Sequence, residues 1–164
     1  MSSHAVADEL QSLLVEVIDL SLSSKQAHWV LGRSRLEPLS AELDDLAADA
    51  WEWAGAVGAR LVGMGVPPDG RAGTVAGQVR RTSFPVGFVD AAEAVAPIVG
   101  RLNELIEECP RRIAVLGESD PVSESLLIDM VVGLVKHRWM LGSQEPGASA
   151  RVDVAARRPR AVRG

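Results

Sequence analysis

The sequence predicts an all-α four-helix bundle with a short helix in the long link between the second and third helices. Apolar residues recur at helical spacing over four long stretches, as in helices that share one core. Of all residues, 47% are hydrophobic but only 4% are aromatic, and Tyr is absent. This composition favours close-packed helices over a β-sandwich. Residues 65–87 are rich in Gly and Pro, and so long a connection suits a bundle in which the helices it joins run in parallel.

The first half of the chain supplies two long helices and the short one. The first helix is predicted over residues 7–31, and the second from Pro38 to about Met64. The second is rich in Ala and Gly. Each interior Gly costs helix stability relative to Ala, and the close approach of another helix is the reason we expect for several of them together. A short helix is predicted over residues 74–81, because a connection of this length without secondary structure is uncommon in a compact bundle.

The second half supplies two more long helices with clear starts. Asp90 followed by Glu93 forms a capping pattern at the start of the third helix. Pro97 and Pro110 then predict a kink or a break, because each removes a backbone donor inside the helix. The fourth helix is predicted from Asp120-Pro121 to about Gly142.

The chain divides into a bundle over residues 7–143 and an Arg-rich, disordered tail over residues 144–164. The formal net charge is −5, yet the segment from 151 onward carries a single Asp and five arginines, namely Arg151, Arg157, Arg158, Arg160 and Arg163. The planar guanidinium suits phosphate, so we expect non-specific DNA binding through this tail. A charged, solubilising end without a partner is the alternative that the sequence leaves open.

Several classes of protein are disfavoured by what the sequence lacks. Cys109 is the only cysteine, so no intrachain disulfide framework exists. Neither a signal peptide nor an apolar run of about 18 residues is found, so we expect no membrane partner and a cytoplasmic location, associated with the nucleoid if the tail meets DNA.

Three segments carry a resemblance to a known family. They are LSLSSKQAHW near the end of the first helix, ARLVGMGVPPDG after the second, and DPVSESLLIDMVVGLVKHRWML in the fourth. Together they resemble the Dps family (DNA-binding proteins from starved cells), the small relatives of ferritin, over residues 8–143. The resemblance implies a ferritin-like four-helix bundle, assembly into a homo-oligomeric dodecamer, iron handling and DNA protection.

The family's ferroxidase centre lies between two subunits and needs five ligands. The resemblance places its first His on His28 and one Asp on Asp44. The remaining three positions fall on residues that are not ligands, namely Ser40, Gly55 and Ala59. We therefore expect a degraded centre that binds iron weakly, because Fe(II) requires a set of imidazole and carboxylate ligands.

Two alternatives share this fold. An iron-storing enzyme would still oxidise Fe(II) with altered ligands: His28, Asp44, Glu52 and water. A di-iron site inside the bundle would need Glu-x-x-His pairs, and no Glu lies three residues before a His in this sequence. A third hypothesis is a helical module that works through protein partners without a cage.

Acidic residues surround the start of the fourth helix: Glu118, Asp120, Glu124 and Asp129. The resemblance implies that they line pores through which cations enter the shell. Helix capping and a solvated face explain the same residues without a pore, because acids are favourable at helix starts.

Overall fold

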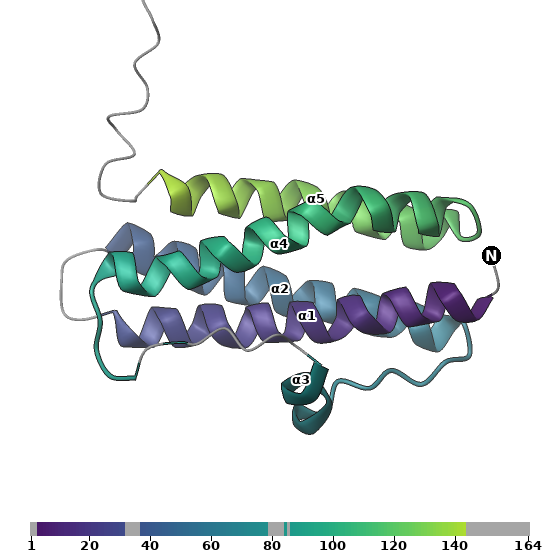
Figure 1. The fold of residues 1–164 in the computed structure, drawn as a ribbon, viewed down its shortest axis with the longest axis horizontal. Coiled ribbons are helices and arrows are strands. Elements are labelled where there is room, and N and C mark those ends of the chain that lie inside the picture. The colour runs from purple at the N-terminus through teal and green to yellow at the C-terminus, as the bar shows by residue number, and fades with distance from the viewer. Residues whose placement is uncertain (1–2, 32–36, 79–83, 85, 144–164) are drawn as a thin grey trace, which may run out of the picture.

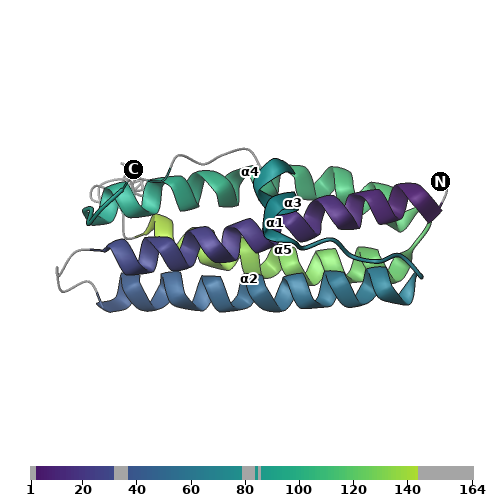
Figure 2. The same ribbon diagram turned by 90° about the horizontal axis from the view of Figure 1, so that it is seen from below.

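The computed structural model describes residues 3–31, 37–78, 84 and 86–143, which form five helices. Their bounds are Ser3–Val30 (α1), Glu37–Gly63 (α2), Ala72–Gln78 (α3), Ala91–Gly117 (α4) and Pro121–Gly142 (α5). The four long helices lie side by side, and α2 and α4 run in the same direction (Figures 1 and 2). The all-α four-helix bundle, with a short helix in its long link, is thereby confirmed. The predicted disordered tail lies outside the described residues.

Local sequence explains where α4 and α5 begin. The Asp90 side chain accepts a hydrogen bond from the Glu93 backbone N–H at 2.9 Å, and the Glu93 side chain accepts one from the Asp90 N–H at 3.4 Å. This is the reciprocal capping box that the sequence predicted. Asp120 caps α5 in a similar way, with Pro121 in its first turn.

The helix break predicted at Pro97 or Pro110 does not occur. α4 continues through both prolines to Gly117. Ile98 and Leu102 next to the first proline, and Leu105 and Cys109 before the second, are buried in the bundle core. Their burial offsets the lost backbone hydrogen bonds, so tertiary packing overrides the local cost of Pro.

The glycines of α2 were expected to let helices approach closely, and among the described residues this does not occur at Gly55, Gly58 or Gly63. A Cβ added at Gly55, Gly58 or Gly63 would meet nothing within 4 Å. These glycines therefore leave a shallow, unoccupied face on α2 instead of a packed contact. Close packing in this chain occurs instead at Gly133 of α5, where an added Cβ would lie 2.5 Å from Trp53 Cζ2.

Gly133→Ala should destabilise the bundle by about 1–3 kcal/mol, because the methyl group would force Trp53 out of its packed position. Gly100→Ala is the matched control, since it lies within α4 and an added Cβ there meets nothing within 4 Å. Gly100→Ala should stabilise the fold by up to about 1 kcal/mol, because Ala has a higher helix propensity than Gly. Urea denaturation followed by circular dichroism measures both, and a neutral Gly133→Ala would contradict the packing described.

Within the described residues, none of the helices combines the length and the apolar character that a membrane span requires.

Candidate functional site

His28 near the end of α1 lies against the start of α2. Its Nδ1 is 2.9 Å from the carbonyl oxygen of Ser40 and 3.0 Å from the Ser40 hydroxyl. The resemblance had placed the family's second His ligand on Ser40, so the structure brings these two aligned positions together. A ring that donates from Nδ1 to the carbonyl presents the lone pair of Nε2 outward, as a metal-binding imidazole does.

Asp44, the second predicted ligand, is held by Lys25 of α1. The Lys25 ammonium donates a hydrogen bond to Asp44 Oδ1 and forms an ion pair with it. This hydrogen bond, the charge of Lys25 and the nearby His28 ring together lower the pKa of the Asp44 carboxyl. We call Lys25, His28, Ser40 and Asp44 the α1–α2 polar cluster. An ammonium already neutralises the one carboxylate in this cluster.

The remaining predicted ligand positions on α2 carry no metal-binding atoms. Gly55 and Ala59 are exposed and offer only hydrogen and methyl groups. Among the residues that the structure describes, no group of three or more His, Cys, Asp or Glu side chains is arranged to hold a metal ion. Within one chain the α1–α2 polar cluster therefore offers one imidazole and one carboxylate, and the carboxylate is already paired with Lys25.

A second cluster, which the sequence analysis missed, lies between α2 and α5. The ring of His137 is fully buried, with Nδ1 2.6 Å from Glu42 Oε1 and Nε2 2.7 Å from Asp49 Oδ2. Both ring nitrogens therefore lie within hydrogen-bond distance of a carboxylate oxygen. The ring edge also faces Trp53, with centroids 6.2 Å apart. We call Glu42, Asp49 and His137 the buried triad.

The sequence analysis did not predict the contact between Asp49 and His137. A signal was present: Glu42 and Asp49 are seven residues apart and so share one face of a helix. Both ring nitrogens are occupied by carboxylates, so this geometry locks two helices together and leaves no space for a metal between the ligands.

The four acids predicted to line a pore have different surroundings. Glu118 and Asp129 are exposed, and Glu124 is half-buried beside Gly117. Asp120 is buried, caps α5 and accepts hydrogen bonds from Arg60 of α2 at 2.7 and 3.1 Å. Asp120 thus has a structural role in joining α2 to α5, while the pore role of the four acids stays a prediction.

Asp120→Asn should destabilise the protein by about 1–3 kcal/mol at neutral pH. Burial alone would raise the pKa of Asp120, but hydrogen bonds from Ser123 and Arg60 outweigh it, and the pKa is lowered. A lowered carboxyl pKa stabilises the fold above the unfolded value near 4, and this contribution is lost as the pH falls below it. Urea denaturation measures the free energy of unfolding at pH 7 and near pH 3. The difference between Asp120→Asn and wild type should be smaller near pH 3 than at pH 7. The exposed Asp129→Asn is the control, and an equal effect of Asp120→Asn at both pH values would contradict this account.

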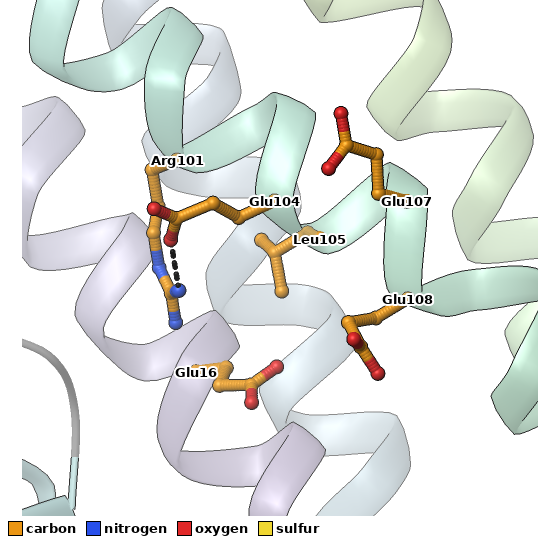
Figure 3. Close-up of a pocket in the computed structure, with 6 residues that line it drawn as sticks. All are labelled: Glu16, Arg101, Glu104, Leu105, Glu107 and Glu108. Atoms are coloured by element: carbon orange, nitrogen blue, oxygen red, sulfur yellow. Dashed lines mark hydrogen bonds and ion pairs between the residues drawn. The ribbon is translucent and has the colours of Figure 1, made fainter.

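A polar hollow of about 220 Å³ lies between α1 and α4 (Figure 3). It is lined by Glu16, Arg101, Glu104, Leu105, Glu107 and Glu108. The buried Arg101 donates a hydrogen bond to Glu104 at 2.9 Å and lies 3.8 Å from Asp19. Desolvation raises the pKa of the Asp19 carboxyl, although the charge of Arg101 opposes this. Arg101 thus compensates part of the acidic charge around the hollow, and we assign no small-molecule ligand to it.

Comparison with known proteins places this geometry in a family. The ferritin-like domain model matches residues 7–144. "DNA protection during starvation protein 2" of Deinococcus radiodurans is 27% identical over 132 residues, which are 80% of this chain and 55% of that protein. This chain therefore spans little more than half the length of that relative. The "fine tangled pili major subunit" of Haemophilus ducreyi is 25% identical over 85% of this chain and 74% of that protein.

Solved structures agree with the sequence comparison. The structure of Dps from Microbacterium arborescens in the high iron form aligns with a TM-score of 0.80 and 28% identity, and covers 86% of this chain and 92% of that one. Sequence and fold thus point to the same relatives. The chain belongs to the ferritin-like family, and within that family to the Dps proteins.

Proposed function

We propose that this chain forms a closed homo-oligomeric shell, a dodecamer, that protects DNA and handles iron with a degraded ferroxidase centre. Likeness to Dps proteins, one of them determined in a high iron form, supports the general function. Iron is then the substrate or cargo of the shell and is bound weakly at each centre. We also propose that the protein is cytoplasmic and associated with the nucleoid.

Exposed apolar side chains on α1 and α2 support assembly from many copies. Leu22, Trp29 and Trp51 are each about three-fifths exposed. Large apolar side chains on a small protein's surface indicate contact with a partner. The open face at Gly55 and Gly58 lies on the same helix as Trp51. Closed symmetry is the usual outcome for such homo-oligomers.

The ion pair between Lys25 and Asp44 is the observation that carries the proposal of a degraded centre. A metal ion at Asp44 would have to displace an ammonium that already satisfies the carboxylate. With His28 as the one imidazole and with Gly55 and Ala59 in place of carboxylates, iron would gain too few bonds for tight binding. The alternative of a working enzyme would use His28, Asp44 and Glu52, and Glu52 is exposed on α2.

Two measurements test this function. Light scattering at micromolar concentration should find a particle of about twelve chains. A monomer would contradict the proposed shell and would favour a module that works through other partners.

Stopped-flow absorbance should find slow Fe(II) oxidation that changes little in His28→Ala. Rapid oxidation that is lost in His28→Ala would instead establish the enzyme with altered ligands.

DNA protection by the tail needs its own test. We propose that Arg151, Arg157, Arg158, Arg160 and Arg163 bind duplex phosphates without sequence preference, with many tails on one shell acting together. Gel-shift titration should show retardation by the full chain that weakens steeply with salt. A chain ending at Gly147 keeps every described helix and should lose retardation. Equal retardation by both chains would remove the tail from the mechanism.

A further inference from the structure

The polar hollow between α1 and α4 carries more acidic than basic charge. Glu104, Glu107 and Glu108 of α4 line it and are exposed (Figure 3), and we call these three residues the acidic rim. Glu104 accepts a hydrogen bond from Arg101, and Glu108 accepts one from Arg111, each at 2.9 Å. Glu107 has no ion-pair partner among the described residues. The acidic rim therefore has charge to offer to a basic partner.

Buried polar atoms without hydrogen bonds gather around the same hollow. In the part of the chain that the structure describes, four buried side-chain atoms of this kind occur, and three of them are Asp19 Oδ2, Arg101 Nε and Arg112 Nε. Arg101 lines the hollow with a side chain that is only 9% exposed, and Arg112 binds Glu16 on its wall. A buried N–H without an acceptor is costly. The hollow therefore favours an occupant that brings an oxygen acceptor as well as positive charge.

An Arg-rich peptide segment meets both requirements. Its side chains bring cations to the acidic rim, and its backbone carbonyl oxygens can accept a hydrogen bond from Arg101 Nε. A metal ion would satisfy the carboxylates alone, and among the described residues no group of three or more acidic, His or Cys side chains is arranged to hold one. A small anion would be repelled by the acidic rim. The chemistry of the hollow thus points to a basic peptide.

This chain carries such a segment after its last described helix, with five arginines and one Asp from residue 151 onward. α5 ends at Gly142, and residues 118–120 join it to α4 as an antiparallel neighbour. Gly142 therefore lies beside the first turns of α4, and the acidic rim lies about 13–20 Å further along that helix. The stretch from Gly142 to Arg151 spans up to about 30 Å when extended. The arginines of the tail are thus within reach of the rim.

We propose that the Arg-rich tail docks on the acidic rim as an autoinhibitory contact that competes with DNA for the same arginines. This inference rests on the DNA-binding role proposed above for the tail. A guanidinium paired with a rim carboxylate is not available to a phosphate, so DNA must displace the tail from the rim. The acidic rim thus lowers the affinity of the protein for DNA while every tail residue stays in place.

A peptide of residues 148–164 tests the docking without DNA. When the peptide carries a fluorescent label, anisotropy at low ionic strength should show that it binds to the chain ending at Gly147, which keeps every described helix. The full chain should bind it at least about threefold more weakly, because its own tail already occupies the rim. Glu104→Gln, Glu107→Gln and Glu108→Gln together, introduced into the shorter chain, should weaken binding at least about tenfold, because three ion pairs are lost.

The matched control removes the same charge away from the hollow. Asp45→Asn, Glu118→Gln and Asp129→Asn together change exposed residues that do not line it, and should alter peptide binding by less than about twofold. An equal loss in the control would mean that the peptide responds only to overall acidity, and would overturn the proposal. Absence of peptide binding to the shorter chain, or equal binding to both chain lengths, would overturn it as well. Circular dichroism confirms that each variant is folded.

Gel-shift titration of the full chain tests the competition with DNA. The variant with a neutralised rim should retard duplex DNA at about three- to fivefold lower protein concentration than the wild type, because its arginines are released. The charge-matched control should shift this concentration by less than about twofold. Equal gains in both variants would overturn the autoinhibition. If no chain retards DNA while the peptide still binds to the rim, the DNA-binding role of the tail is wrong and the docking contact remains.

Discussion

His137→Ala is expected to cost about 3–5 kcal/mol of unfolding free energy, because it removes the buried ring whose two nitrogens bond Glu42 and Asp49. Glu42 is buried, and without the ring its charge would have no partner in the bundle interior. Asp49 is less affected, since its side chain is 43% exposed and water can solvate it. Thermal or urea denaturation at neutral pH and fixed protein concentration measures the loss.

The control for this prediction separates the charge from the packing. His137→Leu combined with Glu42→Leu removes both the buried carboxyl group and the ring that it bonds, and should recover most of the lost stability. Glu42→Gln in the native background keeps an oxygen that accepts from Nδ1 and should cost less, about 1–3 kcal/mol. Should His137→Ala prove as stable as the wild type, the buried triad would have no role in joining α2 to α5.

The helices were predictable because their signals are local. Asp90 with Glu93, and Asp120 with Pro121, mark helix starts by hydrogen bonds within a few residues. The continuity of α4 through Pro97 and Pro110 was not predictable in this way. It depends on residues such as Ile98 that are buried against other helices, and burial of this kind appears only once the fold is assembled.

The candidate site, like the helices, was predictable from the sequence only in part. Alignment with a family pattern identified His28, Ser40 and Asp44 as neighbours, and the structure brings His28 to Ser40 and close to Asp44. The pairing of Asp44 with Lys25 joins two helices and was not predicted, because Lys25 is not among the five ligand positions that the resemblance supplies. The buried triad was missed for a similar reason: His137 lies 95 residues from Glu42, and no spacing rule connects them.

The largest functional change should come from restoring carboxylates to α2. Gly55→Asp with Ala59→Glu supplies the two missing oxygen ligands, and the open space around Gly55 admits the longer side chain. Lys25→Gln then frees Asp44 from its ion pair. We expect the triple variant to oxidise Fe(II) at least about tenfold faster than the parent, which corresponds to about 1.4 kcal/mol of barrier.

The control for this variant also carries Lys25→Gln and adds two carboxylates away from the site, so that its net charge equals that of the triple variant. Ala56→Asp with Gly63→Glu places two carboxylates at exposed positions of α2 that no ligand pattern uses, and it should leave the oxidation rate near that of the parent. Adding His28→Ala to the triple variant should remove the gain, because the imidazole would again be missing from the ligand set. A gain of the same size in the control would mean that negative charge on α2 merely concentrates Fe(II) near the surface. A triple variant that folds and assembles normally but gains nothing would show that the lost ligands do not lie where the Dps pattern places them.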